Sequence, residues 1–513
     1  MDSLTLHFRL PYKKKPINQQ HQTHAPPFAT ITAMKQRRYI IVPFPAQGHI
    51  NPCLQFSKRL IGTGAEVVFV TSISVHRRIM KNKTSTSTPD GLSFFLYSDG
   101  FDDGFKPRGD PHRYLSELRR GSKQAVSDLV NSGAKHGCPF TCVFYSLCVQ
   151  WIAETTRELH VPSALLWIEP ATVFGIYYYF FHGYEDEIKN NMNDPSYSIE
   201  LPGLPLKLTG RDLPTFMDAT KSENNETFQL NMFREQFDVL DKETKIPRVL
   251  VNSFDALEPE AFISISDDQV KLFGIGPLIQ STFSGEEDHE DQSETSFRGD
   301  LYQINTKDNY MEWMSSKPVR SVIYVSFGSF CVLPKPQMEE IAGGLLDYGR
   351  PFLWVITERQ SEERKKEEDE LSCREELEKL GRIVSWCSQL DVLSNTSLGC
   401  FVTHCGWNST LESLVCGVPM VAFPRWLDQG TNAKLIEDVW KTGLRVKANK
   451  EGIVERDEIK RCLELVMGDD DIGRNTKKWK DLGRDALKAG GTFDKNFKAF
   501  LDEIDQEKGH FVD

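Results

Sequence analysis

Short apolar segments alternate with helical segments along the chain, in two successive series. Parallel strands joined by helices produce this alternation, since helices then cover both faces of each sheet. The pattern predicts an α/β protein with two Rossmann-like, doubly wound parallel sheets. The expected strands include YIIVPF, EVVFVT, FTCVFY and PSALLWI in the first half, and SVIYVSFG, PFLWVI, CFVTHCG and PMVAFP in the second.

The chain length agrees with this division, because 513 residues exceed one typical hydrophobic core. No internal sequence repeat is evident, so the halves are expected to share architecture only. Between them, the acidic and serine-rich SGEEDHEDQSETS predicts a mobile linker near residues 284–300. The charged run SEERKKEEDE, which starts at Ser361, is interpreted as a solvated surface loop.

The first 34 residues are basic, and Asp2 is their only acid. Such a leader can be a transit peptide, but it has neither the apolar core of a secretion signal nor an Arg-rich amphipathic helix. We interpret residues 1–34 as a disordered N-terminal extension. No membrane span is predicted either, because the longest apolar stretch, SALLWIEPATVFGIYYYFF, is interrupted by Glu169 and Pro170.

Composition and charge exclude several classes of protein. The formal net charge of −12 argues against a nucleic-acid partner. Eleven cysteines without paired CxxC spacing indicate free thiols in a reducing compartment, which predicts a cytoplasmic protein. Cys400, His404 and Cys405 are the nearest approach to a metal-ligand set, and strand and turn packing explains them better.

The segment from Trp386 to Gln429 combines a buried strand with a helix start. GCFVTHCG is typical of a strand that ends at glycine, and NSTLESLVCG of a helix that begins near Asn408 and Ser409. Unpaired N–H groups at a helix N-terminus lie at the positive end of its dipole and suit a diphosphate. His404 and the Ser409 hydroxyl would supply further donors.

Other residues of this segment suit the remaining parts of a sugar nucleotide. Glu412, one helical turn further along, can accept hydrogen bonds from ribose hydroxyls, and Trp386 offers an aromatic face to a base. Asp428 and Gln429 follow the strand PMVAFP, and each can bind two vicinal hydroxyls of a hexose. The segment therefore predicts a sugar-nucleotide pocket.

HCGWNS, LES, GVPM and the closing DQ make this segment closely resemble the donor-binding signature of the plant UDP-dependent glycosyltransferases of family 1. The resemblance implies a GT-B fold, with two Rossmann-like domains that face a cleft. It implies that uracil stacks on Trp386 and pairs with the backbone of Cys387, and that Ser329, in the turn SFGSF, lies near the phosphates. The implied ligands are Gln389 and Glu412 for ribose, His404, Asn408 and Ser409 for phosphate, and Trp407, Asp428 and Gln429 for the sugar.

The final Gln of the motif usually accompanies UDP-glucose in this family, so Gln429 favours glucose as the donor sugar. The motif also departs from the family pattern: Asn395 replaces a common His and Ser388 a common Pro. Both lie in its outer part. Arg425 and Leu427 also differ from the commonest residues, and since they flank the sugar-binding pair, they are candidates for tuning donor or acceptor choice.

A second candidate site lies near the amino end, in YIIVPFPAQGHINPC. An apolar strand is expected to run into a loop that contains Gly48 and carries His49, with Pro52 in the first turn of the next helix. Ligands of doubly wound sheets bind at the carboxyl ends of strands, and imidazole is the side chain best suited to accept a proton near neutral pH. The resemblance also places the catalytic base in this loop, so His49 is predicted to be that base.

The family usually gives this histidine an aspartate partner, and Ser146 stands at that position here. A neutral hydroxyl can orient an imidazole, but it stabilises the imidazolium less than a carboxylate does. Either another acid reaches His49, or the acceptor is acidic enough to need little base assistance, as a phenol or a carboxylic acid is. A hydroxyl residue is common here in the anthocyanin 5-O-glucosyltransferase and crocetin glucosyltransferase branch, which the chain resembles.

These observations together predict a monomeric enzyme that transfers glucose from UDP-glucose to a small plant molecule, with inversion and without a metal or other cofactor. Flavonoids, anthocyanins, phenolic acids and apocarotenoid acids all remain possible acceptors. We expect an acceptor domain over residues 35–275, a UDP-sugar domain over 276–490, and, by resemblance, a helix over 491–513 that packs back on the first domain.

Three alternatives remain. A nicotinamide dehydrogenase is disfavoured, because no GxGxxG follows the first strand. A non-catalytic UDP-sugar binder and a transferase that uses another UDP-sugar stay open. The acceptor pocket is expected in first-domain loops around Trp151, residues 174–181 and residues 99–105.

Overall fold

The computed structural model describes residues 37–81, 88–105, 110–218, 224–280, 309–329, 331–357 and 371–509. The predicted N-terminal extension, the acidic linker near residues 284–300 and the charged run from Ser361 lie outside the described residues.

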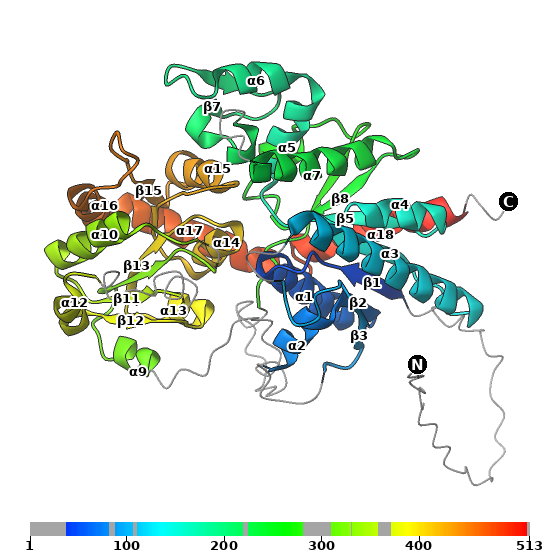
Figure 1. Ribbon diagram of the computed structural model, residues 1–513, viewed down its shortest axis with the longest axis horizontal. Helices are drawn as coiled ribbons and strands as arrows, with labels where there is room; N and C mark the ends of the chain where they lie inside the picture. Colours follow the sequence, from blue (N-terminus) through cyan, green and yellow to red (C-terminus); the bar gives the residue numbers. More distant parts are fainter. Residues whose placement is uncertain are drawn as a thin grey trace, which may run out of the picture. The chain divides into compact units, whose positions relative to one another are not determined.

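A parallel sheet of seven strands organises the first half of the chain, in the order β3-β2-β1-β4-β5-β8-β9 (Figure 1). Its order reverses at β1, so strands continue outward on both sides, as in a doubly wound sheet. The strands are β1 (Arg38–Val42), β2 (Glu66–Ser72), β3 (Leu92–Tyr97), β4 (Cys142–Ser146), β5 (Ser163–Trp167), β8 (Arg248–Val251) and β9 (Lys271–Gly274). Four of them coincide with expected strands, whereas β3, β8 and β9 were not expected.

A second parallel sheet, of six strands, lies in the other half, in the order β12-β11-β10-β13-β14-β15. The strands are β10 (Val322–Ser326), β11 (Phe352–Val355), β12 (Arg382–Val384), β13 (Leu398–Thr403), β14 (Met420–Ala422) and β15 (Gly443–Arg445). The four strands expected in this half are all present. A separate antiparallel pair joins β6 (Ser198–Glu200) to β7 (Lys207–Thr209).

Helices connect the strands of both sheets. Those of the first half are α1 (Gln47–Gly62), α2 (Ile73–Lys81), α3 (Pro111–Lys135), α4 (Trp151–Glu158), α5 (Ala171–Tyr179), η1 (Phe180–Tyr184), α6 (Glu185–Asn191), η2 (Gly210–Asp212), η3 (Thr215–Met217), α7 (Asn224–Asp241) and α8 (Pro259–Phe262). Those of the second half are α9 (Tyr310–Ser315), α10 (Lys335–Tyr348), α12 (Arg374–Leu380), α13 (Gln389–Ser394), α14 (Trp407–Cys416), α15 (Gln429–Lys434), η8 (Leu435–Val439), α16 (Arg456–Gly468), α17 (Asp470–Leu487) and α18 (Thr492–Gly509).

The central strand β1 explains why the apolar runs are continuous. Successive side chains of a strand point to opposite faces. Tyr39 and Ile41 belong to one buried cluster, and Ile40 and Val42 to another. Helices thus bury both faces, and a strand in this position needs apolar residues throughout.

The last described helix, α18, packs on the first sheet although it follows the second sheet in sequence (Figure 1). Its Phe497 lies 5.7 Å from Phe56 and 6.4 Å from Tyr39, centroid to centroid. Glu503 of the same helix pairs with Arg248 at 2.8 Å. The first core therefore includes residues from both ends of the described chain. No helix in the described ranges combines the length and the apolar character needed to cross a membrane.

Candidate active site

His49 lies in the first turn of α1, at the carboxyl end of β1. A loop does follow β1, but the expectation that it contains Gly48 and carries His49 was wrong, because α1 already begins at Gln47. Pro52 lies inside the helix rather than in its first turn. The ring of His49 stands beside Phe44, with the centroids 5.3 Å apart. The histidine nevertheless keeps the place at the edge of the sheet where ligands of such folds bind.

Ser146, the last residue of β4, is the hydrogen-bond partner of His49, at 3.1 Å between Oγ and Nδ1. The same oxygen accepts from the N–H of Phe44 at 2.8 Å, and its hydroxyl donates to the carbonyl of Leu147 at 3.2 Å. With its hydrogen given to Leu147, the oxygen can only accept from His49. This favours the tautomer with the proton on Nδ1, which leaves the lone pair of Nε2 available to a substrate.

The surroundings of His49 keep its ring neutral. Burial lowers the pKa of His49 to about 3, and among the residues that the structure describes no carboxylate hydrogen-bonds to it. The imidazole is thus unprotonated at neutral pH, as a base must be. Its low proton affinity also makes it a weak base.

The start of α14 forms the anion-binding turn that the sequence predicts. The helix begins at Trp407 after Gly406, without a side-chain cap, so its first N–H groups stay available to a ligand. His404 precedes it, and a side chain at Gly328 or Gly406 would collide with the His404 ring. Burial lowers the pKa of His404 to about 4, so this ring would act on phosphate as a neutral N–H donor.

Three residues predicted to serve the donor form one hydrogen-bonded cluster. The amide nitrogen of Gln389 donates to Ser409 Oγ at 2.9 Å and to Glu412 Oε2 at 2.6 Å. The hydroxyl of Tyr324 donates to the amide oxygen of Gln389 at 3.3 Å. Tyr324 was not predicted, since it reads from the sequence as an ordinary strand residue.

The remaining residues of the predicted nucleotide site follow the strands β12 and β10. Trp386 is half-buried and follows β12, and Cys387 is buried with its thiol 3.4 Å from the hydroxyl of Tyr324. Ser329 lies half-buried in the turn after β10, next to Gly328, whose φ is +75°. This left-handed backbone conformation favours glycine at the turn.

The side chains of Trp407 and Asn408 face the first half of the molecule. The indole N–H of Trp407 donates to the carbonyl of Asn252 at 2.8 Å, and the amide of Asn408 donates to the carbonyl of Gly48 at 3.1 Å. Gly48 lies four residues before Pro52, which has no N–H to bond that carbonyl within α1. Asn408 therefore replaces the missing helical bond, and the two residues can contact a donor only through other groups, such as their backbone N–H.

Asp428 and Gln429 lie at the start of α15, and both are buried. Asp428 Oδ2 accepts from Asn432 at 2.7 Å. The amide oxygen of Gln429 accepts from the backbone N–H groups of Arg425 and Trp426, at 2.9 and 3.1 Å. Its amide nitrogen makes no hydrogen bond to any described residue and is the group left for a sugar hydroxyl.

Glu169 is a residue of this region that the sequence analysis passed over. It follows β5, and its Oε2 is buried without a hydrogen-bond partner in the described part of the chain. Burial raises the pKa of Glu169, and the nearby carboxylate of Asp428 raises it further. An acid inside an otherwise apolar run was the available signal, and it was interpreted only as an interruption of that run.

Two of the three segments expected to form acceptor loops, around Trp151 and over residues 174–181, are helical instead, whereas residues 99–105 lie in a loop after β3 as expected. Trp151 begins α4 and donates to Ser122 Oγ at 2.8 Å, and Phe174 lies inside α5. Both side chains are buried in the core. Aromatic residues were thus a poor guide here, because they pack the core as readily as they line a pocket.

Comparison with known proteins decides the family. Residues 278–486 match the family model described as UDP-glucoronosyl and UDP-glucosyl transferase, and residues 38–99 match a glycosyltransferase N-terminal domain. The chain is 58% identical over 486 residues to phloretin 4'-O-glucosyltransferase of Malus domestica, covering 92% of this chain and 98% of that protein. It is a plant family 1 UDP-glycosyltransferase. This glycosyltransferase is also 54% identical over 475 residues to the chloroplastic crocetin glucosyltransferase of Gardenia jasminoides, covering 92% and 98% of the two chains.

The fold of this glycosyltransferase is matched by a solved structure, Os79 from O. sativa in complex with UDP. The two share a TM-score of 0.75 and 31% identity, over 91% of this chain and all of the other. This match confirms the predicted GT-B fold, and the family model and the relatives named as glucosyltransferases confirm the hexosyltransferase class. The domain boundaries and the roles of individual site residues stay predictions.

Proposed function

We propose that this enzyme transfers glucose from UDP-glucose to an acidic hydroxyl, most readily a phenol, of a plant small molecule. The pairing of His49 with the neutral hydroxyl of Ser146 carries this proposal. A weak, neutral base suits an oxygen that gives up its proton easily. The relative named for phloretin, a phenolic compound, supports a phenolic acceptor.

The reaction is a single displacement with inversion. The acceptor oxygen loses its proton to Nε2 of His49 and attacks the anomeric carbon, while the bond from that carbon to the β-phosphate oxygen breaks. The negative charge on the departing UDP is stabilised by the free N–H groups at the start of α14 and by neutral His404.

Glucose is proposed as the sugar because Gln429 closes the motif and keeps its amide nitrogen available, beside Asp428. UDP-galactose and UDP-xylose are the donors to compete against it. No metal ion is needed in this scheme, so EDTA should leave the rate unchanged. A second acceptor class, a carboxylic acid that yields a glucose ester, is supported by the relative named for crocetin.

We further propose that the enzyme works as a cytoplasmic monomer. One chain supplies both His49 and the donor residues, and all eleven cysteines are free thiols, which suits a reducing compartment. Light scattering of the purified protein and localisation of a fluorescent fusion test the two statements.

The test of the acceptor is a series of substituted phenols of similar shape. Rates with UDP-glucose should rise as the acceptor pKa falls, because less proton transfer must accompany attack. Ser146→Asp gives His49 a carboxylate partner and should flatten this dependence, helping the least acidic phenols most, with thermal melting to verify that the variant is folded. Equal slopes for both proteins would contradict the proposed role of Ser146, and no glucosylation of any phenol or acid would favour a non-catalytic UDP-sugar binder.

A further inference from the structure

A short segment of the first half, Thr209–Met217, contacts the residues that surround the proposed sugar-binding pair. We call it the docking segment; it contains η2 and η3. We call residues Arg425–Thr431 the sugar loop, since they include Asp428 and Gln429. The two segments are more than 200 residues apart in sequence, and their contacts occur on both sides of the pair.

On one side of the pair, Thr215 holds the backbone of Leu427 by two hydrogen bonds. The N–H of Leu427 donates to Thr215 Oγ1 at 2.9 Å, and the N–H of Thr215 donates to the carbonyl of Leu427 at 3.1 Å. Leu427 has a backbone φ of +60°, which residues other than glycine rarely adopt. The paired bonds hold this unusual conformation in place directly before Asp428.

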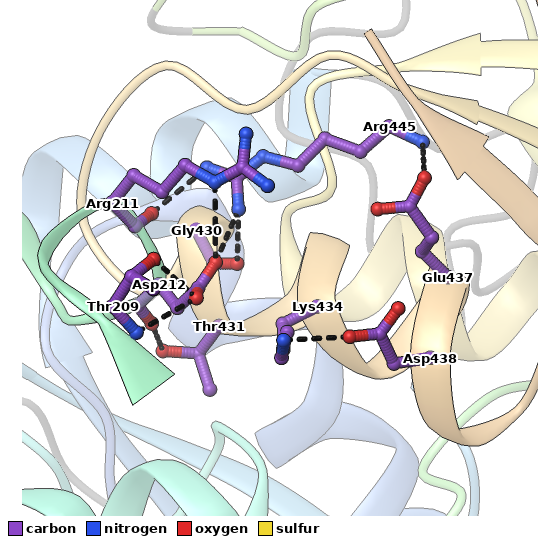
Figure 2. Close-up of polar contacts among 9 residues, drawn as sticks. All are labelled: Thr209, Arg211, Asp212, Gly430, Thr431, Lys434, Glu437, Asp438 and Arg445. Carbon is purple, nitrogen blue, oxygen red and sulfur yellow. Dashed lines mark hydrogen bonds and ion pairs between the residues drawn. The ribbon is translucent and has the colours of Figure 1, made fainter. Parts of the chain in front are cut away.

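On the other side of the pair, Asp212 anchors the sugar loop (Figure 2). Its backbone carbonyl accepts from the hydroxyl of Thr431 at 2.6 Å, and its carboxylate pairs with Arg445 at 2.6 Å. The Arg445 guanidinium also donates to the carbonyl of Arg211 at 2.8 Å. The second carboxylate oxygen of Asp212 accepts from the backbone N–H and hydroxyl of Thr209, at 2.9 and 2.7 Å.

These contacts are buried and closely fitted. The side chains of Asp212 and Arg445 are 1% and 9% exposed. A Cβ at Gly430 would collide with the carbonyl oxygen of Arg211, so only glycine allows this approach. Arg445 belongs to β15 and also donates to the carbonyl of Gly430 at 3.5 Å. Because a buried charge must be paired, the ion pair fixes the docking segment against β15 and, through Gly430, against the sugar loop.

We propose that Thr215 and Asp212 are positioning residues for donor-sugar recognition: the docking segment sets the geometry of Asp428 and Gln429 from the opposite half of the molecule. This inference rests on the proposed use of that pair to bind glucose. Neither residue lies in the donor motif, and each acts through the loop that carries the pair. The residues predicted to bind uracil, ribose and phosphate lie outside the sugar loop. Losing these contacts should therefore leave nucleotide binding unchanged.

The test compares Thr215→Val with Thr215→Ser in the full-length protein. Valine keeps the shape and the backbone N–H of threonine but removes the hydroxyl that accepts from Leu427, whereas serine retains it. Thr156→Val is the matched control, since Thr156 is a buried first-half threonine whose hydroxyl also forms hydrogen bonds. Calorimetry measures the dissociation constants for UDP, UDP-glucose and UDP-galactose.

We expect Thr215→Val to weaken UDP-glucose about three- to tenfold, the range for one lost hydrogen bond, and to reduce its preference over UDP-galactose. UDP affinity should stay within about twofold of the original, since the residues predicted to bind uracil, ribose and phosphate lie outside the sugar loop. Thr215→Ser and Thr156→Val should behave as the unmodified protein does. Equal weakening of UDP and UDP-glucose, or no change in either, would overturn the positioning role while leaving the proposed function intact. An unmodified protein that binds UDP-glucose and UDP-galactose equally would overturn the glucose assignment and this inference with it.

Discussion

On the donor side of the site, Gln389 donates hydrogen bonds to both Ser409 and Glu412, all within 23 residues of sequence. On the acceptor side, His49 depends on a single hydroxyl, that of Ser146, which lies 97 residues away. The residues of a local polar cluster lie in one sequence motif, so the motif alone predicts the chemistry of the cluster. A base whose strength depends on one distant neighbour cannot be characterised from its own loop.

The largest effect that separates the two sides should come from His49→Ala. Removing a general base lowers turnover about 10²- to 10⁴-fold. Affinity for UDP and UDP-glucose should stay nearly unchanged, because the donor cluster is built without His49. Initial rates and calorimetry measure the two quantities. Near-normal activity on every acceptor would remove His49 from the mechanism.

A smaller effect, confined to binding, should follow changes on the donor side. Glu412→Ala should weaken UDP and UDP-glucose equally, by about 10- to 100-fold if the carboxylate binds the ribose hydroxyls. Gln429→His should change the preference between UDP-glucose and UDP-galactose and leave the affinity for UDP unchanged. A loss of UDP affinity in the Gln429 variant would mean that this residue touches the nucleotide rather than the sugar.

The smallest effect should be a pH dependence of UDP-glucose binding on the donor side that has no counterpart at His49 on the acceptor side. Burial raises the pKa of Asp428 to about 6, and the carboxyl group of Glu169 lies near it. The Asp428 carboxylate is therefore charged above pH 6 and gains a proton as the pH falls. His49, with its pKa lowered to about 3, stays neutral over the same interval. Between pH 8 and pH 5, UDP-glucose should therefore weaken about two- to tenfold relative to UDP.

The rate at saturating UDP-glucose should show no inflection near pH 6.5, the ordinary pKa of a histidine. Calorimetry and initial rates over that interval test both statements. A rate that halves near pH 6.5 would indicate that His49 is more exposed to water in the working enzyme than in the structure.

Much of the fold could be predicted because its main strands are buried on both faces. The strands β1, β4, β10 and β13 read as continuous apolar runs for that reason. The edge strands β3 and β9, with the patterns LSFFLY and KLFG, include positions that are not buried and give no such signal. The inner strand β8, RVLV, was passed over although it is as long as the predicted β11.

The predicted site shows the same limit. Donor residues close in sequence could be assigned to one pocket, whereas the partners of Trp407 and Asn408 lie 155 and 360 residues away and were missed. Pro52 was assigned to a first turn because proline usually stands there. Its actual place inside α1 depends on Asn408, which bonds the carbonyl that Pro52 leaves unpaired, and no local pattern reveals that compensation.

The packing of α18 on the first sheet has a consequence for the growing chain on the ribosome. Phe493, Phe497 and Phe500 complete the core around Tyr39 and Phe144, yet they are synthesised more than 200 residues after the last strand of that sheet, β9. The first half emerges first, but part of its core is missing until α18 has left the exit tunnel. Domains that fold during synthesis usually do so from the amino end. Here we expect the UDP-sugar half to finish folding first. A protein truncated before residue 492 should lose the fold of the first half, because it lacks α18.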